Sequence, residues 1–297
     1  MAGYAAFVAI FVLVHAAQIP RAPYVAIAHA TLLVAMALLP PRGAAWEAPR
    51  SGDGRGMRQL RATARFLRYT YPALLITPFF EEVALTVNAA TPEAPYWFER
   101  TLIAVDRRLF GTTLAAVLSQ AGNSALDEVM HAFYLSYYLL ITAGIVLAWR
   151  GPARGTATPG HGFHSVFTGM MLGFFLSFVC YPFLPARGPW EHPALMEGLR
   201  PFGGWAFTRA IELIIAGAAV SGGCFPSAHV SGTWALTLGL FPHHRRAALI
   251  FGAMALGLTV ACVYTRYHHA LDVFAGLAVA LVAAPLGRRI AARRRQA

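Results

Sequence analysis

The sequence predicts an all-α integral membrane protein, a polytopic helical bundle of about eight spans with amphipathic helices on its outer surface. Of the 297 residues, 57% are hydrophobic and only 12% are charged. Soluble globular domains carry about 25% charged residues, because water must solvate their surfaces. This composition excludes an ordinary soluble enzyme and indicates a chain that buries most of its side chains in lipid or in protein.

Eight apolar runs account for the predicted spans. Several approach the roughly 20 residues that a helix needs to cross the hydrocarbon core, and the shorter ones require flanking residues. No basic residue precedes the first run, so we interpret it as a retained span and not as a cleaved signal peptide. The runs cover residues 3–19, 22–40, 69–90, 126–149, 163–184, 229–242, 247–264 and 270–286.

Two segments between the spans have apolar residues at helical spacing with polar residues between them. They extend from Glu93 to Asn123 and over residues 206–220. This pattern predicts amphipathic helices on the outer surface, the first of them covering the candidate site. We divide the chain into residues 1–68, which hold two spans and a basic cytoplasmic loop, and residues 69–297, the membrane core.

The distribution of arginine predicts the orientation of the bundle. All 24 basic residues are arginines, and 16 of them lie in residues 42–68, 150–154, 245–246 and 288–295 beside only two acidic residues. Cytoplasmic loops collect basic residues during insertion, so both termini are predicted to be cytoplasmic. The net charge of +11 serves orientation and contact with anionic lipid, and no nucleic-acid partner is required. We expect a plasma membrane, the inner membrane of a bacterium.

Two histidine segments in the C-terminal third carry the candidate chemistry. In residues 224–229 a Pro-Ser step precedes His229 where a loop enters a helix, and free N–H groups there favour a phosphate. His268 stands four residues before Asp272, which places both side chains on one helix face. The carboxylate can hold one ring nitrogen and leave the other free to attack phosphorus. His269 is the alternative partner of Asp272, and the span count places both segments on the outer side.

The three cysteines are scattered and support neither a disulfide framework nor a zinc site. We interpret them as small apolar side chains. Cys224 neighbours the Pro-Ser-x-His step, but we interpret it too as a packed thiol. No metal and no cofactor are required by the residues that we identify.

These segments resemble the type 2 phosphatidic acid phosphatase superfamily over roughly residues 100–286. The resemblance rests on residues 226–229, the following span, and His268-x-x-x-Asp272 with Gly276. The first signature segment of that superfamily is matched only by Arg187-Gly188-Pro189, since cysteine stands at position 180 in place of the family lysine.

The third signature segment also departs from the family pattern. Cys262 stands where the family has an arginine, and Arg266 stands two residues before the histidine. In these departures, and in residues 106–111 and 133–138, the chain is similar to the inositol phosphorylceramide synthase branch, whose members transfer a phosphorylated headgroup between lipids.

The resemblance implies a role for each matched residue. His268 is the expected nucleophile, Asp272 orients it, and His229 protonates the leaving group. Ser227, Arg187 and Arg266 are expected to bind the phosphoryl oxygens.

Three further residues are candidates for binding the hydroxyl groups of a headgroup or an acceptor. Glu81 and Glu82 lie near the outer end of the third span, where carboxylates facing lipid are costly. Snorkelling of these carboxylates to the interface explains them equally well. His269 is the third candidate.

We therefore expect a metal-independent enzyme that moves a phosphoryl or phospho-headgroup unit from a lipid phosphate donor to a lipid or polyol acceptor through a phosphohistidine. With water as acceptor, the same site is a lipid phosphatase. A non-catalytic lipid-binding protein and a transporter with a histidine proton relay are the remaining alternatives. A relay requires ionisable residues at mid-span depth, whereas this cluster lies at span ends.

Overall fold

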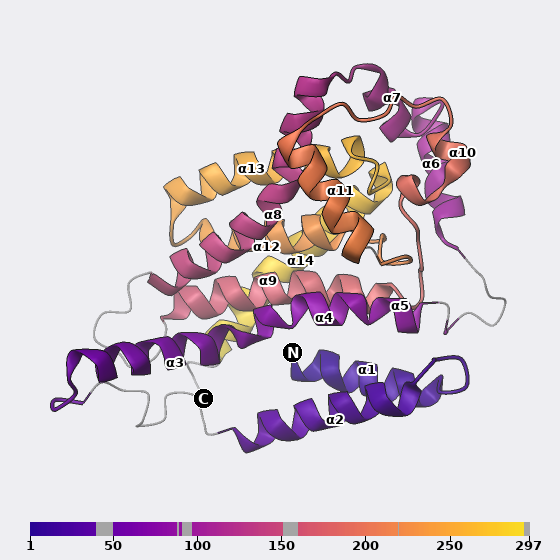
Figure 1. Cartoon of the computed structure of the whole chain (residues 1–297). Coiled ribbons are helices and arrows are strands. Elements are labelled where there is room, and N and C mark those ends of the chain that lie inside the picture. Colours follow the sequence, from indigo (N-terminus) through magenta and orange to yellow (C-terminus); the bar gives the residue numbers. More distant parts are fainter. Residues whose placement is uncertain (40–49, 88, 91–96, 151–159, 219, 294–297) are drawn as a thin grey trace.

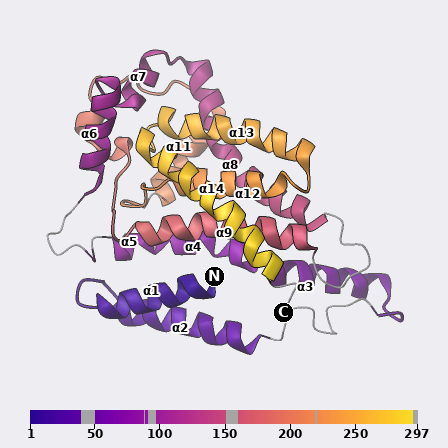
Figure 2. The ribbon, with the colours of Figure 1, turned by 180° about the vertical axis from the view of Figure 1, so that it is seen from behind.

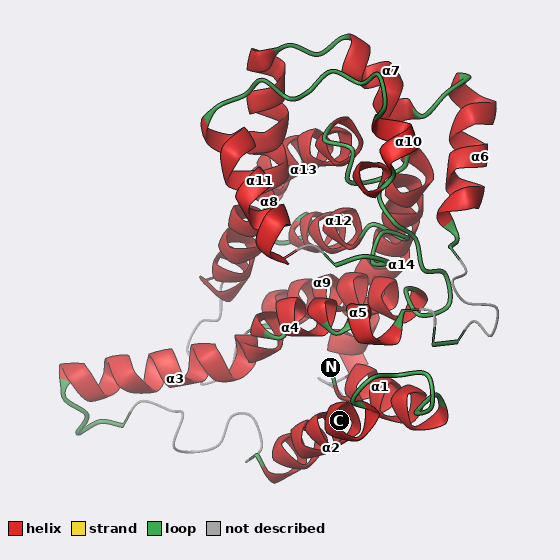
Figure 3. Cartoon of the chain, turned by 45° about the vertical axis from the view of Figure 1, so that its right-hand side comes forward, coloured by secondary structure: helices red, strands yellow, loops and turns green. Residues whose placement is uncertain are grey.

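The described part of the chain is built from helices. The computed structural model describes residues 1–39, 50–87, 89–90, 97–150, 160–218 and 220–293. Within these ranges, strand-like pairing is limited to one isolated parallel bridge between Ala186 and Gly223. Figure 3 shows helices and connecting loops, without a strand among the described residues. The predicted all-α fold class is confirmed.

Three helices form the centre of the bundle, and two more pack against one of them (Figures 1 and 2). A Cβ atom on Gly173 would lie only 2.7 Å from the carbonyl oxygen of Ser231, so glycine permits this close approach of two central helices. The central helices are α9 (His161–Cys180), α12 (Ala228–Leu240) and α14 (Ala270–Arg293), and the two that pack against α12 are α8 (Ser124–Arg150) and α13 (Arg245–Tyr264).

Four described helices are long and apolar enough to cross a membrane, and the protein is an integral membrane protein. They are Ser124–Arg150, Gly162–Cys180, Arg245–Tyr264 and Ala270–Arg293. α1 (Ala2–Val14) and α2 (Ala22–Leu38) have 13 and 17 residues, fewer than the roughly 20 of a full span. α12 also has only 13 residues, and its neighbours bury most of it, so it is surrounded by protein and not by lipid.

The basic segment before the third apolar run forms a helix, whereas we predicted a loop. α3 (Arg55–Leu74) contains the predicted boundary between residues 68 and 69. Its apolar side packs against Trp149, which the ring of Phe66 meets edge-on at 5.2 Å. This segment is helical because its apolar residues recur at helical spacing, so one side packs while Arg55 and Arg58 are exposed on the other. Two short helices, α4 (Ile76–Glu81) and α5 (Val83–Thr86), continue α3.

The α1–α2 hairpin packs against α4 and α9, below them in Figure 1. The ring of Tyr4 stacks on Phe175 of α9 with centroids 4.8 Å apart. On α2, Nε2 of His29 lies 3.4 Å from a carboxylate oxygen of Glu82, and both side chains are largely buried. The hairpin is therefore joined to the core by aromatic packing and by one buried acid–histidine contact.

Short helices gather at one end of the bundle, with α6, α7 and α10 at the upper right of Figure 1. Both predicted surface segments contain helices, and Gly111, with φ of +76°, divides the first into two. Residues 91–96, at the start of that segment, lie outside the described residues. The elements are α6 (Glu99–Phe110), α7 (Leu114–Gln120), η1 (Pro189–Glu191), α10 (Pro193–Met196) and α11 (Ala206–Ala218).

Candidate active site

A pocket of about 150 Å³ lies at this end of the bundle, between α4, α8, α9, α11 and α12. Apolar side chains of α4 and α11 form part of its wall, among them Ile76, Phe80, Ile214 and Ile215. No arginine is among the described residues that line it. Its lining also includes Thr77, Glu81, Tyr134, Tyr137, Tyr138, Phe174, Phe178, Trp190, Glu191, Cys224, His229, Tyr267 and His268.

His268 lies at the pocket, where its two ring nitrogens face different partners. Nδ1 is 3.4 Å from Oδ2 of Asp272, and Nε2 is 3.2 Å from Oγ of Ser227. The backbone N–H of His268 donates to the carbonyl of Cys262 at 3.0 Å, which fixes the turn after α13. The ring is therefore held between a carboxylate on one nitrogen and a hydroxyl on the other.

The pairing of His268 with Asp272 forms at a helix start and not along a helix face. His268 precedes α14, which begins at Ala270, so the reason we gave for the spacing was wrong although the two residues do meet. Oδ2 of Asp272 accepts the backbone N–H of His269 at 2.7 Å, as an acidic residue in the first turn does in a capping box. Asp272 is fully buried, and its Oδ1 has no hydrogen-bond partner among the described residues.

Ser227 joins the two histidine segments. It is the N-cap of α12, and its Oγ accepts the N–H of Val230 at 3.4 Å. Its own N–H donates to the backbone carbonyl of Asp272 at 3.0 Å. A Cβ atom on Gly276 would lie 2.7 Å from the carbonyl oxygen of Ser227, so this glycine allows α14 to approach the start of α12.

His229, in the first turn of α12, lies in the same pocket as His268. The centroids of the two imidazole rings are 5.9 Å apart. Nε2 of His229 lies 3.4 Å from the hydroxyl of Tyr134, and its ring packs against Tyr137 with centroids 4.5 Å apart. The structure thus brings both predicted catalytic histidines to one pocket, although about 40 residues separate them in the chain.

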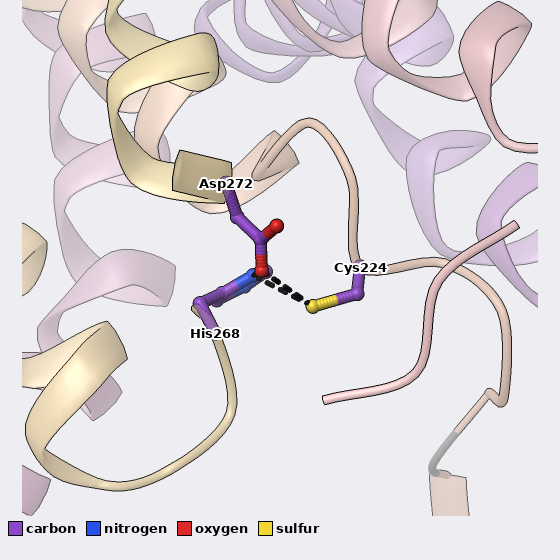
Figure 4. Close-up of side chains that lie close together, drawn as sticks. All are labelled: Cys224, His268 and Asp272. Atoms are coloured by element: carbon purple, nitrogen blue, oxygen red, sulfur yellow. Dashed lines mark hydrogen bonds and ion pairs between the residues drawn. The ribbon is translucent and has the colours of Figure 1, made fainter. Parts of the chain in front are cut away.

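Our sequence analysis interpreted Cys224 as a small apolar side chain. The structure places it beside the pair of His268 and Asp272. Its Sγ donates to Oδ2 of Asp272 at 2.8 Å and lies 3.3 Å from Nδ1 of His268 (Figure 4). Burial, together with the charge of Asp272, raises the pKa of the thiol well above its ordinary value. The thiol is therefore protonated and is not a candidate nucleophile. The sequence feature that could have identified Cys224 as a site residue is its position three residues before Ser227.

Arg187, expected to bind phosphate, forms an ion pair with α6. Its Nε and Nη2 donate to Oε1 of the buried Glu99 at 2.9 and 2.7 Å, and its backbone N–H donates to Oε2 at 3.2 Å. The guanidinium also lies 4.4 Å from the ring centroid of Trp97. The next residue, Gly188, lines the pocket, but Arg187 does not.

Arg266 is also directed away from the pocket. Its φ of +68° places it in the left-handed region, directly after the C-cap of α13. The buried guanidinium donates to Oγ of Ser119 at 2.8 Å and to the carbonyl of Arg200, and it lies 4.1 Å from the ring centroid of Phe202. Phosphate binding by Arg187 or Arg266 stays a prediction that requires these protein contacts to be exchanged.

The three candidate ligands for hydroxyl groups are separated by the fold. Glu81 lines the pocket, whereas Glu82 faces His29 of the N-terminal hairpin. His269 is fully buried outside the pocket lining, with Nε2 3.3 Å from the carbonyl of Arg187 and Nδ1 4.0 Å from Asp106. Our sequence analysis did not identify Glu191, which lines the pocket beside Trp190, and no pattern around it pointed there.

Comparison with known protein families gives one match, to the PAP2 superfamily, over residues 100–286. The matched range contains both histidine segments, three of the four long apolar helices and the first part of the fourth, α14. Neither the curated proteins nor the solved structures gave a match. The match does not distinguish the inositol phosphorylceramide synthase branch, which stays a prediction. Because the matched range covers well over half of the chain, the protein belongs to the PAP2 superfamily.

Proposed function

We propose that the protein transfers a phosphoryl unit from a lipid phosphate through a covalent intermediate on His268. Membership of the PAP2 superfamily supports phosphatase- or phosphotransferase-type chemistry on lipid phosphates. The observation that carries the proposal is the placement of His268, with Nδ1 toward Asp272 and Nε2 toward the pocket lining and Ser227. With the Nδ1 proton held toward the carboxylate, Nε2 keeps the lone pair that attacks phosphorus. We expect the 3.4 Å separation of Nδ1 and Oδ2 to shorten when the ring becomes positively charged.

In the first step, Nε2 of His268 forms a bond to phosphorus while the bond from phosphorus to the leaving oxygen breaks. His229 gives its proton to that oxygen, a role supported by its place in the same pocket. In the second step, an acceptor hydroxyl attacks phosphorus, the N–P bond breaks, and the hydroxyl proton passes to His229. His268 and His229 then return to their starting protonation states.

The start of α12 supplies the contacts that we propose for the phosphoryl oxygens. The first N–H groups of a helix have no partner within the helix, and the helix dipole favours an anion there. Ser227 places its hydroxyl at the same point, 3.2 Å from the attacking nitrogen. In this proposal Arg187 and Arg266 act mainly on the scaffold, because each guanidinium already has protein partners.

The apolar wall of the pocket supports a lipid as donor. Ile76 and Phe80 on α4 and Ile214 and Ile215 on α11 can contact the first methylene groups of acyl chains. A volume of about 150 Å³ admits a headgroup but not whole chains, so the chains lie in the surrounding bilayer. We place the protein in a bacterial inner membrane, with this end of the bundle outside the cytoplasm and both termini on the cytoplasmic side, because the opposite ends of the long helices carry Arg150, Arg245, Arg246 and Arg293.

We propose a hydroxylated lipid or polyol as the acceptor, in keeping with the predicted phosphotransferase branch. Glu81 and Glu191 line the pocket together with four tyrosines and Trp190, and carboxylates and aromatic rings are suited to a polyol. Water as acceptor, giving a lipid phosphatase, is the second candidate, because the superfamily match supports it equally.

The test uses protein purified in detergent and a lipid monophosphate and a lipid diphosphate, each radiolabelled in the phosphate. Label should become attached to the wild-type protein through a bond that acid breaks and alkali does not, as expected of a phosphohistidine. His268→Ala should not acquire label, and stable labelling of that variant would overturn the assignment of the nucleophile.

The products identify the acceptor. A new labelled lipid or polyol phosphate that forms only when a polyol such as inositol is present supports the phosphotransferase. Free phosphate as the sole product in every mixture supports the phosphatase. Folded protein that neither acquires label nor forms product contradicts both.

A further inference from the structure

The side chains of Cys224, His268 and Asp272 place three different metal-ligand atoms within reach of one another (Figure 4). Sγ is 2.8 Å from Oδ2 of Asp272 and 3.3 Å from Nδ1 of His268, and the last two atoms are 3.4 Å apart. All three residues are buried. The proposed phosphotransfer explains His268 and Asp272, but it gives the thiol no role.

A small change in these distances would produce a metal site. Zinc holds sulfur, nitrogen and oxygen ligands at about 2.0–2.3 Å, which places tetrahedral ligands about 3.3–3.8 Å from one another. The separations of 3.3 and 3.4 Å already lie in this range, and the 2.8 Å separation of Sγ and Oδ2 reaches it if these two atoms move apart by about half an ångström to one ångström. Sulfur, imidazole and carboxylate together favour zinc over magnesium or calcium, which prefer oxygen ligands alone.

A second observation concerns the other carboxylate oxygen of Asp272. Oδ1 has no hydrogen-bond partner among the described residues, although the residue is fully buried. A buried carboxylate oxygen without a partner is costly, and a cation bound through both carboxylate oxygens is one way to satisfy it. Cys224 and His268 both line the pocket, so an ion can reach this cluster from the pocket.

We propose that Cys224, His268 and Asp272 form an inhibitory binding site for zinc and other thiol-seeking divalent cations. Binding releases the thiol proton to solvent and shifts the ring proton of His268 from Nδ1 to Nε2, and a water molecule from the pocket completes four ligands. The ion then occupies the position of the Nδ1 proton, so Asp272 no longer supports the positive charge that develops on His268. The inhibition rests on the proposed function, whereas the binding does not.

Binding is tested with Co²⁺, whose bond to a thiolate gives a charge-transfer absorption that carboxylate and imidazole ligands do not produce. The whole purified protein should show this band. Cys224→Ala and Cys224→Ser should both lack it, and Cys180→Ala, a control at a cysteine outside the cluster, should keep it. A band of equal strength in the Cys224 variants, or no band in the wild type, would overturn the proposal. The serine variant keeps a small polar side chain in case the alanine variant does not fold.

Inhibition is tested with buffered Zn²⁺, each variant being compared with its own activity without metal. The concentration that halves activity should rise at least about tenfold in Cys224→Ser and stay unchanged in Cys180→Ala. Equal sensitivity of the wild type and Cys224→Ser would overturn the proposed inhibition. If the protein turns over no lipid phosphate, the proposed function fails, and the Co²⁺ spectrum still decides whether the site exists.

Discussion

Two regions of this protein pair an acidic residue with a histidine four positions away, and they use the pair differently. At the start of α8, Asp127 precedes His131, and at the start of α14, His268 precedes Asp272. His131 directs Nδ1 to the backbone carbonyl of Asp127 at 2.7 Å and so leaves the carboxylate free for other partners. Only the α14 pair brings its imidazole toward its carboxylate.

Every carboxylate oxygen at the start of α8 is satisfied. Both oxygens of Asp127 accept from the guanidinium of Arg200 at 2.6 and 2.7 Å, and the N–H of Gly203 and the hydroxyl of Tyr264 add contacts at 2.8 and 2.7 Å. Glu128 accepts three backbone N–H groups at the start of α11, at 2.7 to 3.2 Å. These acids hold the loop before α11 and cap that helix.

The carboxylate of Asp272 is left incompletely satisfied. Its Oδ1 has no partner among the described residues, and its Oδ2 is 3.4 Å from the ring of His268. A carboxylate that already accepts from several donors has little room for another, whereas an acid with remaining capacity can accept a stronger hydrogen bond from an imidazolium that forms beside it. The same residue types therefore build a scaffold in one region and a reactive site in the other.

The largest effect is expected from removal of the two histidines that the comparison contrasts. His268→Ala should lower turnover by at least about 10⁴-fold even in protein that stays folded, because the nucleophile is lost. His131→Ala should lower the stability by about 2 kcal/mol, because a buried side chain is truncated, while folded protein keeps its activity. Turnover and thermal unfolding are measured for both variants. Full activity in His268→Ala together with lost activity in folded His131→Ala would contradict the distinction between the two regions.

His229→Ala should lower turnover of lipid phosphates by roughly 10²- to 10⁴-fold, because the leaving oxygen is no longer protonated. An aryl phosphate with a good leaving group needs no acid, so with that substrate the loss in the first step should be much smaller. The amount of labelled enzyme formed from each substrate measures this step. His243→Ala, on the exposed loop before α13, serves as the control. An equal loss with both substrates would contradict the role of His229 as an acid.

Asp127→Asn should lower the free energy of unfolding by about 3 kcal/mol, because it leaves the Arg200 guanidinium without its charged partner. Arg200 is one-third exposed, so water limits the loss to the lower part of the range for buried pairs. Chemical or thermal unfolding gives the value. A loss of activity without a loss of stability would mean that the start of α8 contributes directly to the reaction.

Gly276→Ala should cost about 1–3 kcal/mol and reduce turnover, because the added methyl group would lie 2.7 Å from the carbonyl oxygen of Ser227. α14 would then have to move away from α12, and His268 would move away from Ser227. Gly217→Ala in α11 is the matched control, since no atom lies within 4 Å of its added methyl group. Similar melting temperatures and activities for the two variants would contradict the close-contact argument.

The smallest effect concerns pH. Burial raises the pKa of Glu191, which contacts Ser221 and the N–H of Gly188. The folded protein therefore binds the proton of the Glu191 carboxyl group more tightly than the unfolded chain does. The resulting stability is complete below the ordinary value of 4.5 and is lost as pH rises through the raised pKa. The stability of the wild type relative to Glu191→Gln should fall over that window, and a constant difference would contradict the shift.

The sequence by itself determined the fold class, the extent of the long apolar helices and the two histidine segments. Composition and span length follow from the bilayer that surrounds the helices, because a helix that crosses the hydrocarbon core needs about 20 apolar residues wherever it lies in the chain. Local spacing likewise identified the surface helices. It also paired His268 with Asp272, but the two residues meet because Asp272 lies in the first turn of α14 and not because they share a helix face.

Only the tertiary structure decided which polar groups meet at the site. Arg187 pairs with Glu99, Arg266 lies against Phe202, and Glu82 faces His29, so none of these three lines the pocket. Cys224 and Glu191 do line it. A side chain's partner depends on elements far away in the chain, and no local pattern records which buried charge will satisfy which other one.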